Sequence, residues 1–163
     1  IDADGLNALA NDPGVVRKRR ADTILTPHTG ELSRIMKLSA AEIEENRVEI
    51  AREEAKDLKA ILVLKGGPTV TGTPRGDVYV NSTGNPGMAT AGAGDVLSGT
   101  IAALYGQHLS AVDAAVCGVF LHGLAGDIAK EKYGELSLVA GDIMQALPRA
   151  IMRTHSSDGR EHR

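Results

Sequence analysis

Aromatic residues are scarce in this sequence. It contains no tryptophan, one phenylalanine and three tyrosines, so aromatic residues make up 2% of its 163 positions. Stacking on an aromatic platform is therefore not expected to dominate ligand recognition. The single cysteine, Cys117, excludes a disulfide within the chain and favours a reducing compartment, which predicts a cytoplasmic location. Because Cys117 lies in an apolar helical stretch, we expect a buried structural thiol rather than a nucleophile.

Charge and hydropathy argue against two further classes of partner. The net charge is −3 and no basic stripe is present, so nucleic acid is not an expected partner. We find no apolar stretch of membrane-spanning length and no signal peptide, so no membrane association is expected. A hydrophobic content of 42% is ordinary for a globular protein, and 163 residues suffice for one domain with a core. No cluster of cysteine and histidine supports a zinc site.

Strand-like and helical patterns alternate along the chain. Strand-length apolar runs occur at 23–25, 60–64, 69–71 and 77–80. Helical spacing occurs at 40–59, after a Ser39–Glu42 capping box, and at 96–105, 111–132 and 142–152. The last two strand-like runs flank a turn and predict a hairpin. Alternating strands and helices with one hairpin indicate a layered α/β fold.

The most informative segment runs from Asn85 to Gly99, where glycines and small residues precede a carboxylate and an apolar helical pattern. Glycine permits close backbone approach and positive φ, and the first N–H groups of a helix can bind an anion. A phosphate site is therefore expected here. Because a carboxylate repels phosphate, Asp95 suits a base that takes a proton from an attacking hydroxyl. The alternative is that Asp95 is an ordinary helix cap.

Two other polar segments directly follow predicted strands, where open α/β sheets bind ligands. The first carries His28 and Arg34, which could hold phosphate or amide groups, and Glu31, which could anchor the loop. The second combines glycines with Lys65, which could meet a nucleotide phosphate, although the spacing of a P-loop is absent. Neither segment requires a ligand. The first is also explained as the start of a helix, and the second as a strand-to-hairpin turn with a solvated lysine.

Two features of the remaining chain bear on the site. Asp2 and Asp4 lie near the start of the chain, and adjacent carboxylates can bind Mg²⁺, although they also cap helices. His122 lies within the long apolar helical stretch, where a packed core histidine is expected rather than a ligand.

Four motifs in this sequence resemble, in order, those of the ADP/ATP-dependent NAD(P)H-hydrate dehydratases of the ribokinase-like superfamily. They are Asp-Ala-Asp-Gly-Leu-Asn at 2–7, Thr-Pro-His-Thr-Gly-Glu at 26–31, Lys-Gly-Gly-Pro-Thr at 65–69, and Asn-Pro-Gly-Met-Ala-Thr at 85–90 with Gly-Asp-Val-Leu at 94–97. The likeness covers residues 1 to about 152. Thr29 stands where the family has proline, and Ala93 stands where serine is frequent.

The resemblance implies a ribokinase-like three-layer αβα sandwich with a mostly parallel central sheet. Because the family domain is longer at its start, residues 1–153 are expected to form an N-terminally truncated dehydratase domain, with 1–5 as the end of a strand. The polar residues 154–163 predict a disordered tail. A homo-oligomer, often a tetramer in the family, is implied as well.

The same resemblance implies a lyase of nicotinamide nucleotide repair. It would dehydrate hydrated NADH or NADPH with ADP, giving AMP and phosphate, or with ATP, and Mg²⁺ would bridge the nucleotide phosphates. Asp95 is the expected catalytic base. Substrate binding is expected at Asp95 and at Asp4, Asn7, His28, Thr29, Gly30, Glu31 and Arg34. Nucleotide binding is expected at Lys65, Gly66, Gly67, Pro68, Thr69, Asn85, Gly87, Met88, Ala89, Thr90, Gly92, Ala93 and Gly94. No protein side chain is expected to ligate a metal.

Two alternatives to a dehydratase stay open from the sequence. A small-molecule kinase of the same superfamily, of the hydroxyethylthiazole or sugar kinase type, would share Gly-x-Gly-Asp but need not share the other motifs. A non-catalytic nucleotide-binding fragment is the second alternative, because the family's first strands and helices, which line part of the substrate site, do not precede Ile1.

Overall fold

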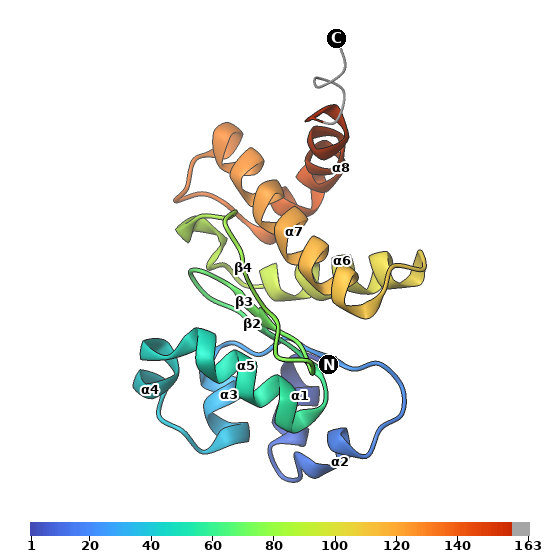
Figure 1. The fold of residues 1–163 in the computed structure, drawn as a ribbon. Coiled ribbons are helices and arrows are strands. Elements are labelled where there is room, and N and C mark those ends of the chain that lie inside the picture. The colour runs from blue at the N-terminus through green and yellow to red at the C-terminus, as the bar shows by residue number, and fades with distance from the viewer. Residues whose placement is uncertain (158–163) are drawn as a thin grey trace.

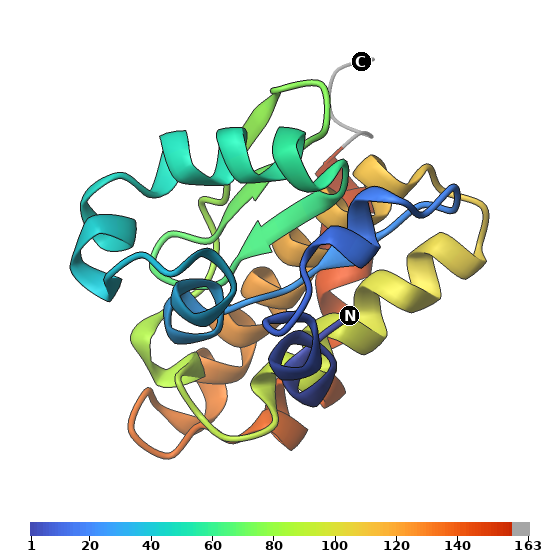
Figure 2. The same ribbon diagram turned by 90° about the horizontal axis from the view of Figure 1, so that it is seen from below.

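The computed structural model describes residues 1–157, and residues 158–163 lie outside the description. A four-stranded sheet separates two groups of helices (Figures 1 and 2). The strands are β1 (Ile24–Leu25), β2 (Ile61–Leu64), β3 (Val70–Gly72) and β4 (Val78–Val80). The helices of one group are α1 (Ala3–Leu9), α2 (Gly14–Arg17), α3 (Thr29–Met36), α4 (Ala40–Glu45) and α5 (Arg47–Leu58). Those of the other are α6 (Ala93–Gly106), α7 (Ala111–Tyr133) and α8 (Ala140–Ser157), preceded by the 3₁₀ turn η1 (Pro86–Met88).

The sheet has the order β1-β2-β3-β4 and is mixed. β1 and β2 run parallel, with Ile24 opposite Ile61, whereas β2–β3 and β3–β4 are antiparallel. The predicted hairpin is therefore confirmed. The expectation of a mostly parallel sheet does not hold for the described strands, because two of their three pairings follow from short connections that reverse the chain. Ile1 lies beside β1: its nitrogen donates to the Ile24 carbonyl (2.8 Å), and its carbonyl accepts from the Thr26 amide (3.1 Å).

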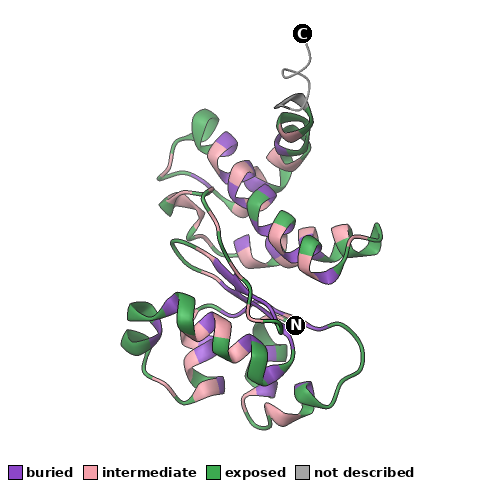
Figure 3. Cartoon of the chain, in the orientation of Figure 1, coloured by how far each residue is buried: buried purple, intermediate pink, exposed green. Residues whose placement is uncertain are grey.

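The central strand β2 is buried along its whole length (Figure 3). Successive side chains of a strand point to opposite faces, so β2 contributes to two cores. Leu62 and Leu64 pack with residues of α1, α3, α4 and α5, and Ile61 and Val63 pack with residues of α6 and α7. A third cluster fills the space between α7 and α8. These clusters give three layers, helix on sheet on helix.

Several helix boundaries differ from those predicted. Asn46 breaks the expected 40–59 helix into α4 and α5, although the Ser39–Glu42 capping box is confirmed. α6 begins at Ala93, before the predicted residue 96, and this places Asp95 in its first turn. α8 continues through Pro148 to Ser157, so residues 154–157 are helical where a disordered tail was expected. The rest of that predicted tail lies outside the described residues.

The long helix α7 is the one described helix that is long and apolar enough to cross a membrane by length and composition alone. This finding corrects the expectation that no stretch has that length. In this fold 61% of its most apolar stretch is buried inside the protein, against α6, α8 and β2, and the core helix of a globular domain meets the same criteria. Cys117 lies on an exposed face of α7, so the expectation of a buried thiol is wrong.

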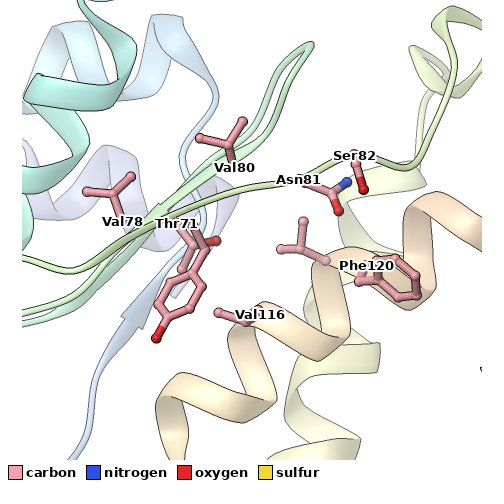
Figure 4. Close-up of a pocket in the computed structure, with 9 residues that line it drawn as sticks. Thr71, Val78, Val80, Asn81, Ser82, Val116 and Phe120 are labelled. Carbon is pink, nitrogen blue, oxygen red and sulfur yellow. The ribbon is translucent and has the colours of Figure 1, made fainter.

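A shallow cavity of about 340 Å³ separates α7 from the hairpin (Figure 4). Val116 and Phe120 of α7 line one side of it, and Thr71 and Tyr79 line the hairpin side, whereas the side chains of Val78 and Val80 point away from α7. The segment after β4 lines this cavity and then continues, at 81–82, into the wall of a larger one described below. The passage of this segment across α7 therefore connects the sheet to the candidate site.

Close contact between α7 and the segment after β4 requires glycine at position 123. A Cβ there would lie 2.2 Å from Oγ1 and 2.8 Å from the carbonyl carbon of Thr83. Although alanine is favoured over glycine in helices by about 1 kcal/mol, overpacking costs about 1–3 kcal/mol and displaces backbone. We expect Gly123→Ala to lower the free energy of unfolding, measured by urea denaturation.

Gly99→Ala in α6 is the matched control, because nothing lies within 4 Å of its added Cβ. We expect it to leave stability unchanged or to raise it by up to about 1 kcal/mol. If the two variants had equal free energies of unfolding, the segment at Thr83 would move aside at no cost in stability, and position 123 would not require glycine.

Candidate active site

The amino terminus of α6 has the features of an anion site. Gly92 precedes the helix in the left-handed region (φ 84°), and no side chain caps the first turn. The Ala93 amide donates to the Thr90 carbonyl at 3.2 Å, so the amides of Gly94 and Asp95 remain available to a ligand, and the helix dipole favours a negative one. Gly94 is the second residue of the turn. A side chain there would meet the Lys65 ammonium at 3.3 Å and the Asp2 carboxylate at 3.6 Å.

A cavity of about 950 Å³ opens beside this terminus. Its walls come from loops that follow β1, β2 and β4, from the start of α6 and from one face of α7. They comprise His28, Lys65–Thr69, Asn81–Pro86, Met88–Thr90, Ala93, Gly94, Leu97, Val119, His122 and Gly123. The size lies within the range of small-molecule and cofactor sites. The structure thus brings together most of the predicted nucleotide-binding residues, although they come from segments far apart in the sequence.

Asp95 lies in the first turn of α6 and directly follows Gly94 of the cavity wall, but it does not itself line the cavity. The residue is exposed. Its carboxylate makes no hydrogen bond or ion pair with any other residue of 1–157. The side chain is therefore free to accept a proton from a ligand held at the helix terminus, and the role of catalytic base stays a prediction.

Lys65 is not a free ammonium. Its Nζ lies 2.8 Å from Oδ1 of Asp2 and 3.7 Å from Oε2 of Glu31, and Ser98 donates to the other Asp2 oxygen at 2.8 Å. Burial alone would raise the pKa of Asp2, but the hydrogen bonds from Lys65 and Ser98 outweigh it and hold this pKa below its usual value. Asp2 is thus a charged member of the site that the sequence did not assign.

The other residues predicted near the start of the chain lie elsewhere. Asp4 is exposed on α1 and does not line the cavity. Asn7 accepts a hydrogen bond from Nη1 of Arg34 at 2.8 Å, so these two predicted substrate-binding residues contact each other outside the cavity wall.

His28 and Glu31 form the amino-terminal cap of α3. Nδ1 of His28 accepts from the amides of Gly30 and Glu31, and the Glu31 carboxylate accepts from the His28 amide at 2.8 Å. Glu31 therefore anchors the loop, as predicted, and His28 caps the helix. Of these residues, His28 alone lines the cavity.

Asp127 of α7 holds the glycine-containing segment before α6. It accepts from the Gly84 amide at 2.8 Å and from Nδ2 of Asn85 at 2.9 Å, while Oδ1 of Asn85 accepts from the Gly87 amide at 3.2 Å. Asn85 therefore positions the turn η1 through hydrogen bonds. Sequence reasoning missed Asp127, and the available signal was a carboxylate in a mostly apolar helical stretch.

A family model described as NAD(P)H-hydrate dehydratase matches residues 1–149, most of the chain. The chain belongs to this dehydratase family. It is 51% identical to the bifunctional NAD(P)H-hydrate repair enzyme Nnr of Moorella thermoacetica over 91% of this chain and 28% of that protein. It is 40% identical to the ADP-dependent (S)-NAD(P)H-hydrate dehydratase of Neisseria meningitidis over 90% of this chain and 50% of the relative.

Solved structures of the family confirm the fold class. The ADP/ATP-dependent NAD(P)H-hydrate dehydratase of Bacillus subtilis, co-crystallised with ATP/Mg²⁺, superposes with a TM-score of 0.80 at 36% identity over 83% of this chain and 49% of that one. A ribokinase-like superfamily protein of Enterococcus faecalis gives 0.77 at 28% identity over 94% of this chain and 51% of its own. The αβα layers are thus ribokinase-like. The chain spans about half the length of the single-function dehydratases it matches.

His122 is a further residue of this dehydratase chain that lines the cavity. Its Nε2 is buried and has no hydrogen-bond partner within residues 1–157. Burial lowers the pKa of His122 to about 4, although a backbone hydrogen bond at Ala93 opposes the shift. The imidazole is therefore neutral at pH 7. Its burial agrees with the expected core histidine, but its place in the cavity wall was not expected.

Residues 1–157 contain no group of three or more His, Cys, Asp or Glu side chains placed to hold a metal ion. Asp2 and the first turn of α6, which carries Asp95, nevertheless lie at the same edge of the cavity. Mg²⁺ in phosphoryl-transfer sites is bound through one or two carboxylates together with substrate phosphates. Both Asp2 oxygens already accept hydrogen bonds from Lys65 and Ser98, so most ligands of an ion that arrives with a nucleotide would come from the nucleotide itself.

We expect His122 to make the stability of the folded protein sensitive to acid. The unfolded histidine binds its proton near pH 6.5, whereas the folded one does so at about 4. Stability should therefore be full above pH 6.5 and fall as the pH drops through this window, by at most about 1.4 kcal/mol per pH unit. In urea denaturation, His122→Gln should narrow the stability difference between pH 7 and pH 5 by about 2 kcal/mol.

His155→Gln serves as the control for this measurement, because His155 is exposed on α8. It should retain the pH dependence of the unaltered protein. A His122→Gln variant with that same pH dependence would contradict a buried, neutral His122.

Proposed function

We propose that the protein dehydrates hydrated NADH and NADPH, using ADP or ATP as the phosphoryl donor. The observation that carries this proposal is the uncapped start of α6 in the wall of a cavity of about 950 Å³, with Asp95 directly after Gly94 of that wall. Membership of the dehydratase family supports it, as does the likeness to relatives named for this reaction.

The terminal phosphate of the nucleotide would lie against the first turn of α6. The backbone amides of Gly94 and Asp95 would hydrogen-bond its oxygens, and the absence of a side chain on Gly94 allows that approach. The loop at 65–69, which also lines the cavity, would contact the rest of the nucleotide. These donors are fixed by the backbone and stabilise charge on the transferring phosphoryl group without reorganising.

Asp95 would act on the hydroxyl of the hydrated nicotinamide ring. It takes the hydroxyl proton as the oxygen bonds to the terminal phosphorus, and the bond from that phosphorus to the leaving nucleotide breaks, which converts ADP to AMP. The ring carbon–oxygen bond then breaks and phosphate departs with the bonding electrons. Loss of a proton from the neighbouring ring carbon restores the dihydropyridine. Phosphorylation thus replaces hydroxide by a better leaving group.

Three further parts of the proposal rest on the sequence: a bound Mg²⁺ and a homo-oligomer on the family resemblance, and a cytoplasmic location on the single cysteine. Mg²⁺ bound with the nucleotide would supply positive charge for the phosphates, near Asp2 and Asp95. A homo-oligomer and a cytoplasmic location are also proposed.

The direct test is to incubate the whole protein with hydrated NADH and ADP. We expect NADH, AMP and phosphate to form in equal amounts, with no turnover when ADP is omitted. A stable phosphorylated product would favour a small-molecule kinase, and ADP binding without any product would favour a non-catalytic nucleotide-binding protein.

Asp95→Asn should lower kcat by about 10²–10⁴-fold, the effect expected on losing a general base. Affinity for ADP, measured by calorimetry, should be kept or improved, because removing the carboxylate charge relieves repulsion of phosphate. Asp113→Asn removes a first-turn carboxylate from α7 and controls for loss of a helix-start charge; it should leave kcat unchanged. Near-full activity of Asp95→Asn would refute its assignment as the base.

A further inference from the structure

Arg47 is a buried cation that belongs to none of the four family motifs. It is the first residue of α5, and its side chain is only 9% exposed. Arginine is almost never this buried unless its charge is paired. Both Nη groups of Arg47 are paired, whereas its Nε has no hydrogen-bond partner within residues 1–157. The partners of its guanidinium therefore show what its burial achieves.

One nitrogen of this guanidinium is surrounded by the end of β2 and by the 65–69 loop that follows it. Nη2 donates to the carbonyl oxygens of Leu64 at 3.0 Å, Lys65 at 3.1 Å and Pro68 at 3.1 Å. The loop lies so close that a Cβ on Gly66 would be 2.4 Å from Nη2. The end of β2 and the following loop are thus wrapped around a fixed cationic centre.

The other nitrogen reaches the start of α3. Nη1 donates to both carboxylate oxygens of Glu44, at 3.0 and 3.1 Å, and to the hydroxyl of Thr29 at 3.3 Å. Thr29 in turn donates to Glu44. The Thr29 hydroxyl and the Arg47 charge hold the pKa of Glu44 below its usual value, although burial opposes them. Thr29 directly follows His28, a residue of the cavity wall.

We propose that Arg47 is a positioning residue that fixes the 65–69 loop against the start of α3, and so sets the spacing of two walls of the site. The planar guanidinium can donate in both directions at once, which the single ammonium of lysine cannot. Removing it loosens the loop that would hold the nucleotide. Only the kinetic part of this inference rests on the proposed function, because the hydrogen-bond network exists without any ligand.

The first test is Arg47→Lys in the whole protein, compared by hydrogen exchange without ligand. Exchange should become faster by about tenfold or more at 28–31 and at 65–69, and should stay unchanged in α7. In the dehydratase assay the KM for ADP should rise by about tenfold or more, with a much smaller change in kcat, as expected when ground-state and transition-state binding weaken together.

Arg52→Lys is the matched control, because Arg52 lies on the same helix and pairs with Glu49 at the surface. It should alter neither exchange nor KM. Unchanged exchange at both segments in Arg47→Lys would overturn the proposal. A uniform rise in exchange across the described chain would also overturn it, because that result indicates a general structural role.

Glu44→Gln provides a second test that does not depend on the folding of Arg47→Lys. It leaves the three carbonyl contacts of Nη2 in place and weakens the link to Thr29. Exchange should rise at 28–31 and stay unchanged at 65–69; any other pattern contradicts the proposed bridge. If the exchange changes occur as expected but the unaltered protein does not turn over, the proposed function fails and the positioning role stands.

Discussion

The uncapped amino terminus of α6 is the constraint on which the candidate site depends. The amides of Gly94 and Asp95 in its first turn need a partner, and no side chain within residues 1–157 supplies one. Gly92, at φ 84°, turns the chain into the helix without the steric cost that a side chain would add. The surrounding elements fix the walls of the site around this terminus: Asp127 holds the segment before η1, and Arg47 holds the loop after β2.

The charges near this terminus indicate how an anion would be held. Lys65 is the cation closest to Gly94, yet Asp2 and Glu31 lie within 3.7 Å of its ammonium. Its charge is therefore already compensated before any phosphate arrives. Backbone amides, which carry no net charge, must then provide much of the binding, and a cation brought by the nucleotide would offset the carboxylates. This arrangement differs from a P-loop, in which a lysine contacts the phosphates directly.

The sequence predicted the elements of the fold better than the contacts of the site. The continuous apolar run at 60–64 identified the central strand, because a strand that is covered on both faces carries apolar residues at successive positions. Sequence could not distinguish Asp2, which faces Lys65, from Asp4, which is exposed on α1, since that difference depends on where the strand ends and the helix begins. Arg47 and Asp127 were missed because charged residues on helices are ordinary, and only tertiary packing shows which of them are enclosed.

Hydrogen exchange with and without ADP tests the central claim most directly, because it reads the backbone amides themselves. Saturating ADP should slow exchange at 92–95, at 65–69 and at 81–85, the three segments that meet around the cavity. The hairpin turn at 73–77 and the helix α2, both outside the cavity wall, should be unaffected. Unchanged exchange at 92–95 under saturating ADP would contradict the assignment of the α6 terminus as the phosphate site.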